Sequence, residues 1–259
     1  MLLVIDVGNT NMLFALHNGT EFVGQWRLKT DSERTADEYF VWLESLLRHA
    51  GLSYKAIEHA IISQVVPDCL FHFQRLCRQY FGFEILVVGS QAVSLNLIIE
   101  MDRPEEVGAD RLVNGLAARN HYGHDLIVVD FGTATTFDVL DQKGAYIGGV
   151  ITPGVNLSMA ALYQAAAKLP KIALAQPGRV IGKSTIPAMQ SGIYWGYVSM
   201  IEGMCRRIKD EHGRPMRVLA TGGLCKLFGR VQGLFDLVNP DLTINGLVDI
   251  YRGNKDKIK

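Results

Sequence analysis

The sequence predicts an α/β protein made of two copies of one scaffold, each a mixed sheet flanked by helices. A repeat is the first observation behind this. Residues 2–11 and 126–138 each carry four apolar residues, then Asp, one apolar residue, Gly and a cluster of small hydroxyl or amide side chains. In each copy a second apolar strand, a turn and a third strand follow, which predicts a β-meander. The second observation is that further strands alternate with helices, as in parallel sheets covered by helices.

Length agrees with a duplication. A chain of 259 residues is near the upper limit for one hydrophobic core, so one large or two smaller domains are possible. The repeat favours two. Gly123 and His124 separate the first half from the second meander, which places the expected domains at residues 1–122 and 123–259.

In the first half, a meander over residues 2–28 is followed by Thr35 and Glu38, three residues apart ahead of an apolar run. This spacing is a capping box, so a helix is expected to begin there and to end near Gly51. Pro104 and two Glu residues predict the first turn of a later helix. The other expected elements are strands over 60–67 and 84–88 and helices over 68–81 and 104–122.

The second half begins with the repeated meander at residue 126. A segment with two Pro and two Gly, residues 170–182, is expected to be a loop or flap. The strand that begins at Met216 runs into Gly222 and Gly223. The other expected elements are helices over 156–169, 184–211 and 224–231.

Composition limits the partners. The 26 Lys and Arg balance 26 Asp and Glu, so no net field attracts nucleic acid or an anionic membrane. No segment approaches the roughly 20 apolar residues that span a bilayer. Met1 leads directly into a strand without a signal peptide, and the four cysteines form no C-x-x-C pair. We therefore expect a cytoplasmic protein with buried thiols and no nucleic-acid or membrane partner.

Each repeat has the features of a phosphate site. A buried strand holds its terminal Asp rigidly, Gly lets the backbone approach a ligand, and the following hydroxyl, amide and N–H groups offer donors to an anion. A carboxylate would repel phosphate unless a cation lay between them, so Asp6 and Asp130 are predicted to hold a metal or its water. The alternative is that Asp-x-Gly only caps a hairpin. Two copies with the same flanking strands favour the phosphate site.

A third carboxylate, Asp110, lies beside Arg111 in the predicted helix. Phosphoryl transfer needs a carboxylate that accepts the proton of the attacking hydroxyl, and Asp110 is the candidate. The alternative is an Asp in a helix that is exposed or paired with Arg. Gly222 and Gly223 after a strand suit the base and ribose of a nucleotide, although Gly-Gly is also ordinary turn chemistry. The sequence contains neither a P-loop nor the protein-kinase glycine loop.

Four motifs occur along the chain in a fixed order and spacing: Asp6-x-Gly8-Asn9-Thr10, Gly108-Ala109-Asp110-Arg111, Asp130-x-Gly132-Thr133-Ala134-Thr135-Thr136 and Gly148-Gly149-x-x-x-Pro153-Gly154. Together they resemble the type III pantothenate kinases, and the resemblance covers essentially the whole chain. The resemblance implies the superfamily of actin, Hsp70 and the acetate and sugar kinases, with duplicated actin-like (ribonuclease H-like) domains and a nucleotide cleft between the halves. It implies ATP-dependent phosphorylation of pantothenate to 4'-phosphopantothenate, which opens coenzyme A biosynthesis. The implied cofactors are Mg²⁺ or another divalent cation and K⁺ or NH₄⁺.

The resemblance also implies roles for single residues. Asp110 would be the catalytic base, Asp6 would hold Mg²⁺ through water, and Asp130 would bind the monovalent cation. In a homodimer, Thr185 would reach pantothenate from the partner subunit, near the interface. Met101 stands where the family often has a Tyr that faces pantothenate. The residues expected to bind ATP are Asp6, Val7, Gly8, Asn9, Thr10, Asn11, Met12, Leu13, Thr133, Gly222 and Gly223, and those expected to bind pantothenate are Met101, Gly108, Ala109, Asp110, Arg111 and Thr185.

Two alternatives remain open at this point. A kinase of the same superfamily that acts on a sugar or a short acid would carry the same Asp6 and Asp130 loops with another acceptor site. A regulatory protein would keep the fold and bind nucleotide without turnover. All three acidic residues are present, which argues against an inactive enzyme.

Overall fold

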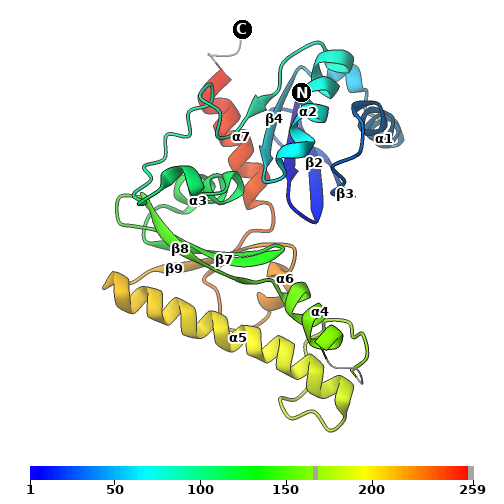
Figure 1. Ribbon diagram of the computed structural model, residues 1–259. Helices are drawn as coiled ribbons and strands as arrows, with labels where there is room; N and C mark the ends of the chain where they lie inside the picture. Colours follow the sequence, from blue (N-terminus) through cyan, green and yellow to red (C-terminus); the bar gives the residue numbers. More distant parts are fainter. Residues whose placement is uncertain (166–168, 256–259) are drawn as a thin grey trace. The chain divides into compact units, whose positions relative to one another are not determined.

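The computed structural model describes residues 1–165 and 169–255, and the chain forms two compact units (Figure 1). Unit 1 comprises Met1–Leu97, Arg103–Ala117 and Thr243–Lys259, and unit 2 comprises Ile98–Asp102 and Ala118–Leu242. The chain therefore passes between the units more than once, and its last helix belongs to the first of them. The domain division at residue 122 stays a prediction.

The sheet of unit 1 has the strand order β3-β2-β1-β4-β5. At its centre, β1 (Leu2–Val7) pairs antiparallel with β2 (Asn11–His17) and parallel with β4 (His59–Gln64). The outer strands are β3 (Phe22–Lys29) and β5 (Leu86–Val87). Because β1 is hydrogen-bonded on both edges and its first four residues are buried, the position of its last residues is fixed by the core.

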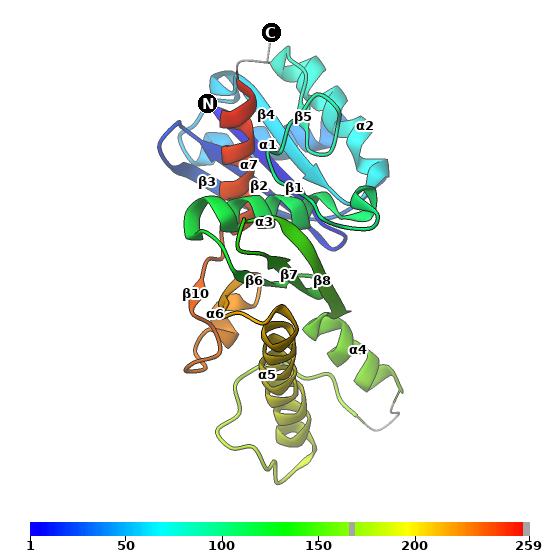
Figure 2. The ribbon, with the colours of Figure 1, turned by 90° about the vertical axis from the view of Figure 1, so that its left-hand side faces the viewer.

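Helices cover both faces of this sheet. Leu3 and Ile5 of β1 join a core with α1 (Ala36–His49) and α2 (Pro67–Leu76), whereas Leu2 and Val4 join a core with α3 (Ala109–Tyr122) and α7 (Leu242–Asn254). In Figure 2, α7 lies in front of the sheet and α1 lies behind it. The alternation along β1 is the two-residue period of a strand with apolar residues on both faces. The predicted capping box of α1, Thr35 with Glu38, is confirmed.

Unit 2 repeats the arrangement with the order β10-β9-β6-β7-β8. Its central β6 (Leu126–Phe131) pairs antiparallel with β7 (Ala134–Leu140) and parallel with β9 (Arg217–Gly222). A core on one face includes residues of α4 (Val155–Ala165), α5 (Thr185–His212) and α6 (Cys225–Phe228). The remaining strands are β8 (Tyr146–Pro153) and β10 (Leu237–Val238).

The duplication extends to small irregularities. The pairing of β2 with β3 shifts register between Leu16 and His17, and that of β7 with β8 shifts at the matching step, between Val139 and Leu140. A β-bulge twists and bends a strand, so matching bulges give both meanders the same curvature. The predicted fold of two duplicated units with mixed sheets and flanking helices is confirmed.

Several predicted boundaries are wrong. Residues Pro104–Glu106 form a separate 3₁₀ helix, held by a 2.6 Å ion pair from Arg103 to Glu106, and α3 begins only at Ala109. Pro67 begins α2 instead of ending a strand, because the first helical position needs no N–H donor. The helix expected over 224–231 is limited to α6, and residues 166–168 of the helix expected over 156–169 lie outside the described residues. The C-terminal helix α7 was not predicted.

Two further features can be compared with the structure: the state of the cysteines and the presence of helices that could span a membrane. All four cysteines are free and buried, as expected. Among the described residues, no helix combines the length and the apolar composition that crossing a bilayer requires.

Close packing of α7 on α3 gives a test of the unit 1 core. A Cβ atom on Gly246 would lie 2.7 Å from the Val113 carbonyl oxygen and 3.0 Å from Ala117 Cβ, whereas nothing lies within 4 Å of one on Gly253. We expect Gly246→Ala to lower the free energy of unfolding by about 1–3 kcal/mol, because backbone cannot yield as a side chain can. Gly253→Ala should leave it unchanged or raise it by up to about 1 kcal/mol through helix propensity. Urea unfolding followed by circular dichroism compares the two, and equal effects would contradict the packing.

Candidate active site

The central strand of unit 1, β1, carries the half-buried carboxylate of Asp6 near its end and continues through a tight turn into β2. The Gly8 N–H donates to the Asn11 carbonyl at 3.1 Å, and Thr30 Oγ1 donates to the Gly8 carbonyl at 2.6 Å. Asn9 is exposed on this turn. The backbone of the turn is therefore fixed in shape by these hydrogen bonds and open to a ligand at Asn9. The side chain of Met12 lies in the core, so only its backbone is available to bind ATP.

A buried hydroxyl adjoins Asp6. In the parallel pairing of β1 with β4, Ser63 stands opposite Asp6, and it is fully buried. Neither Ser63 Oγ nor the neighbouring Gln64 Oε1 has a hydrogen-bond partner within the part of the chain that the structure describes. A buried polar atom without a partner costs free energy, so these two mark a polar position beside the strand end.

Asp110 lies in the first turn of α3, at the same end of the unit 1 sheet. A Cβ atom on Gly108 would lie 2.6 Å from Asp110 Oδ1 and 3.8 Å from Val65 Cγ1, so only glycine lets the carboxyl group pack this closely. Val65 in turn donates its N–H to the Val7 carbonyl at 3.1 Å. The structure thus brings the Gly108–Arg111 segment close to the end of β1, as a shared site requires.

The surroundings of Asp110 change its acidity. Burial raises the pKa of this carboxyl group, and the charge of Arg111 and the Arg111 N–H, which donates to Asp110 Oδ1 at 2.8 Å, oppose that rise without cancelling it. A raised pKa makes the carboxylate a stronger base than an ordinary Asp. The alternative of an Asp held only by its Arg neighbour predicts a lowered pKa instead.

Unit 2 places Asp130 at the end of β6, opposite Thr221 of β9. Thr221 is buried and its Oγ1 has no partner among the described residues, as for Ser63 in the first copy. Gly222 has φ +85°, and a Cβ atom there would overlap Asp130 Oδ1 and the Phe131 backbone. Gly223 donates its N–H to the Phe131 carbonyl at 3.0 Å. The carboxylate therefore packs on a glycine backbone beside an unused hydroxyl.

The other predicted residues of unit 2 fall in three places. Thr133 lies in the turn between β6 and β7, where its carbonyl packs so closely on Gly154 that a Cβ atom there would overlap it. Met101 lies beside β8, with its sulfur 3.7 Å from the position of a Cβ atom on Gly148. Thr185 is exposed and begins α5. Asp130, Thr133, Gly222 and Gly223 thus gather at the end of β6, whereas Met101 lies by β8 and Thr185 on a helix.

Sequence reasoning did not single out Ser63 and Thr221, the buried hydroxyl residues opposite Asp6 and Asp130. Their signal is a hydroxyl residue directly after an apolar run, in a strand that pairs parallel with the Asp strand. That pairing is not visible along the chain. Within residues 1–165 and 169–255, no group of three or more His, Cys, Asp or Glu side chains is arranged to hold a metal ion.

Solved structures resemble this fold over nearly its whole length. A protein described as a conserved putative Baf family transcriptional activator from Campylobacter jejuni has a TM-score of 0.60 and 17% identity, covering 98% of this chain and 99% of that chain. A putative 2-dehydro-3-deoxygalactonokinase from Sinorhizobium meliloti has a TM-score of 0.56 and 11% identity, covering 98% and 99%. At such identities the likeness concerns the fold alone.

Sequence comparison is more specific. The sequence model of the type III pantothenate kinases matches residues 2–207. The type III pantothenate kinase of Paramagnetospirillum magneticum is 56% identical over all of both chains, and that of Acidiphilium cryptum is 54% identical over 95% of this chain and 92% of the relative. The chain belongs to the type III pantothenate kinase family.

Proposed function

We propose that this protein transfers the γ-phosphoryl group of ATP to the terminal hydroxyl of pantothenate, giving 4'-phosphopantothenate at the start of coenzyme A biosynthesis. Family membership supports the acceptor. The observation that carries the chemistry is the half-buried Asp110, whose pKa is raised and which packs on Gly108 near the end of β1. Four free cysteines agree with a reducing cytoplasm as the place of the reaction.

In the proposed reaction, Asp110 accepts the hydroxyl proton of pantothenate. The alcohol oxygen forms a bond to the γ-phosphorus as the bond from that phosphorus to the β–γ bridging oxygen breaks, and ADP leaves with the electron pair. A base is most effective when its pKa approaches the working pH, so a raised pKa suits this role. Phosphoryl transfer otherwise depends on positioning and charge neutralisation.

In unit 1 we assign the ATP phosphates to the loop from Asp6 to Leu13, whose N–H groups are fixed by the Gly8 turn. Mg²⁺ commonly keeps several waters and binds through one or two carboxylates plus substrate phosphates. A single half-buried carboxylate at an open turn fits that pattern, so Asp6 would hold the ion through water. The bound ion would neutralise charge on the phosphates.

In unit 2 we assign K⁺ or NH₄⁺ to Asp130. The buried Thr221 Oγ1 without a partner supports this, since a hard cation takes oxygen ligands and Thr221 stands opposite Asp130 in the sheet. Thr133 would bind a phosphate of ATP. The backbone of Gly222 and Gly223 would lie against the base and ribose, where no side chain intervenes.

We assign pantothenate to residues 108–111 and to Met101, which would present a thioether to the substrate in place of a phenol. Thr185 would reach pantothenate from the partner subunit of a homodimer. Exposed apolar residues near Thr185 support such an interface: Ile181 and Ile186 are exposed, and the loop that carries Ile181 is held to α5 because Ser191 Oγ donates to the Val180 carbonyl.

One assay tests the reaction and its rivals. ADP release is measured with ATP, Mg²⁺ and pantothenate, first in potassium and then in sodium. Turnover that requires both pantothenate and potassium is expected. Turnover with a sugar or short acid but not with pantothenate would favour the related kinase, and nucleotide binding without any turnover would favour a regulatory protein.

Replacing Asp110 by Asn should separate catalysis from stability. We expect Asp110→Asn to lower kcat at least about 100-fold, because general base catalysis typically contributes 10²–10⁴-fold, while ATP binding persists. The same variant should be more stable than the parent at neutral pH. With a folded pKa above the unfolded one, the ionised carboxylate costs stability as pH rises through that window, and Asn removes this cost.

Thermal unfolding at several pH values checks the second effect. The stability difference should shrink as pH falls below the ordinary carboxyl range near about 4, where Asp110 is protonated in both states. Loss of stability at neutral pH together with a near-normal rate would identify Asp110 as a structural, Arg-paired residue.

The two copies allow a matched test of the cation assignments. Asp130→Ala should abolish the stimulation of ADP release by potassium over sodium and leave the dependence on Mg²⁺ concentration unchanged. Asp6→Asn, at the corresponding position of unit 1, should raise the Mg²⁺ concentration needed for half-maximal rate and preserve the preference for potassium. The reverse pattern, or no change in either dependence, would contradict the assignments.

The dimer assignment has its own test. Ile181 is 79% exposed, and Val41, on α1 of unit 1, is 66% exposed. We expect Ile181→Asp to shift the protein from dimer to monomer in size-exclusion chromatography with light scattering, because a buried unpaired carboxylate is costly in an interface. Val41→Asp should leave the mass unchanged. A monomeric parent protein, or a dimer that survives Ile181→Asp, would contradict the proposal.

A further inference from the structure

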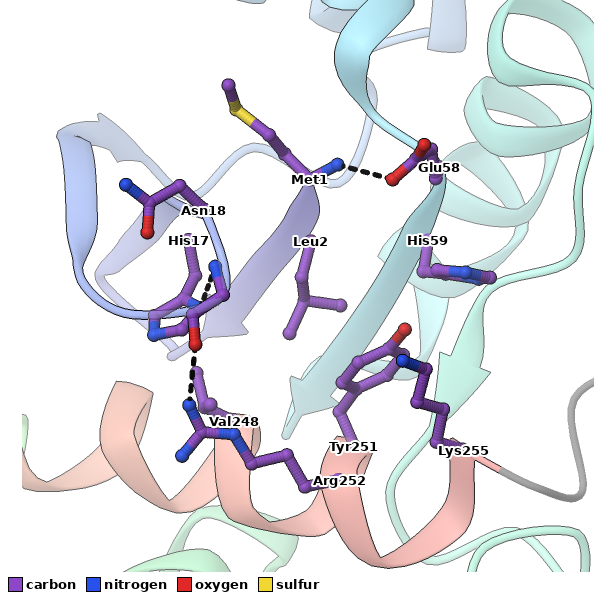
Figure 3. Close-up of a pocket in the computed structure, with 11 residues that line it drawn as sticks. Met1, Leu2, His17, Asn18, Glu58, His59, Val248, Tyr251, Arg252 and Lys255 are labelled. Carbon is purple, nitrogen blue, oxygen red and sulfur yellow. Dashed lines mark hydrogen bonds and ion pairs between the residues drawn. The ribbon is translucent and has the colours of Figure 1, made fainter.

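A pocket of about 250 Å³ lies in unit 1 at the start of β1 (Figure 3). Leu2 of β1 and Val248 of α7 line its apolar part, and the Asn18–Gly19 turn forms one side. Leu2 and Asp6 stand near opposite ends of the same strand, roughly 13 Å apart at the usual rise per residue. Within unit 1, the pocket therefore lies at the other end of β1 from Asp6.

Two cationic side chains line this pocket, Arg252 in the last turn of α7 and Lys255 directly after the helix. Arg252 donates one N–H to the Gly19 carbonyl at 2.9 Å, which leaves its other guanidinium donors available. Lys255 is exposed and lines the pocket, and its charge is one of those that lower the pKa of Glu58. The acidic residue in the lining, Glu58, already accepts a hydrogen bond from the Met1 amino group at 2.8 Å. The pocket thus has positive charge in excess, although the whole chain is neutral.

The aromatic residues of the pocket add hydrogen-bond donors. His17 is 6% exposed, and its Nδ1 accepts the Gly19 N–H at 3.0 Å, so the neutral ring carries its proton on Nε2. The pKa of His17 is lowered, first by burial and then by the charge of Arg252. His59 and Tyr251, whose ring centroids lie 5.5 Å apart, also line the pocket with their aromatic rings.

We propose that this pocket binds a small organic anion, whose carboxylate or phosphate group is held by Arg252 and Lys255 and whose apolar part lies on Leu2 and Val248. Guanidinium and ammonium groups are the usual partners of such oxyanions. The pocket volume of about 250 Å³ lies just below the roughly 300–1,000 Å³ that is typical of sites for drug-sized molecules, so a small acid fits it.

The imidazole protons of His17 and His59 report binding directly in NMR spectra of the intact protein without ATP. Benzoate and phenyl phosphate serve as the carboxylate and phosphate probes, and benzamide is the uncharged match of benzoate. We expect saturable shifts with at least one anion and none with benzamide. Bound anion should also raise the pKa of His17, because negative charge offsets the field of Arg252.

The variant Arg252→Gln/Lys255→Gln should weaken anion binding at least about tenfold, since charge-assisted hydrogen bonds are the stronger kind. Arg206→Gln/Lys209→Gln, with the same spacing near the end of α5, is the control and should bind as the parent does. Unchanged ADP release shows that each variant is folded. If the first variant unfolds, Lys255→Gln alone repeats the test at an exposed side chain.

Either of two results would overturn the proposal. Shifts that grow linearly with concentration for both anions would mean that no site exists. Saturable shifts that persist in the Arg252→Gln/Lys255→Gln variant, or that weaken equally in the α5 control, would mean that these cations do not form it. A preference between benzoate and phenyl phosphate would tell whether carboxylate or phosphate is the natural group.

Discussion

In each unit, the predicted phosphate site depends on a strand that is buried on both faces and ends in a carboxylate. β1 and β6 are each central in a sheet, hydrogen-bonded on both edges and enclosed by apolar neighbours. A strand held in this way cannot slip by one residue without moving its whole apolar set out of the core. Asp6 and Asp130 therefore take their positions from core packing. The loss of solvation falls on these half-buried carboxylates and on the buried hydroxyls of Ser63 and Thr221 opposite them.

Both copies bury the strand that carries the Asp, but they differ in the residue that follows the hydroxyl opposite it. Each Asp stands opposite a buried hydroxyl without a partner, Ser63 in unit 1 and Thr221 in unit 2. The next residue is Gln64 in the first copy and Gly222 in the second. Gly222 admits an oxygen of Asp130 where a Cβ atom would overlap it. A duplicated scaffold has thus acquired two carboxylates with different surroundings, which is what different cation roles for them would require.

Local signals predicted most of the fold. The apolar runs of both meanders and the Thr35 capping box depend on neighbouring residues, so the sequence alone identifies them. The start of α3 and the helix α7 were missed because tertiary contacts decide them. α7 carries Gly246 in its interior, which lowers helix propensity, and only the close approach of Val113 shows why glycine is there. The raised pKa of Asp110 likewise depends on burial beside Gly108, which no pattern along the chain displays.

Neutral composition makes local geometry decisive for every anion that this protein binds. With 26 basic and 26 acidic residues, no long-range field concentrates phosphate at the surface. Binding must come from fixed N–H groups, as at the Gly8 turn, or from cations whose charge is not already matched. Local surroundings also decide the acidity of Asp110. Its carboxyl group has a raised pKa although the charged Arg111 is adjacent. Desolvation there outweighs the neighbouring charge, and the resulting basicity is the property that proton acceptance from an alcohol needs.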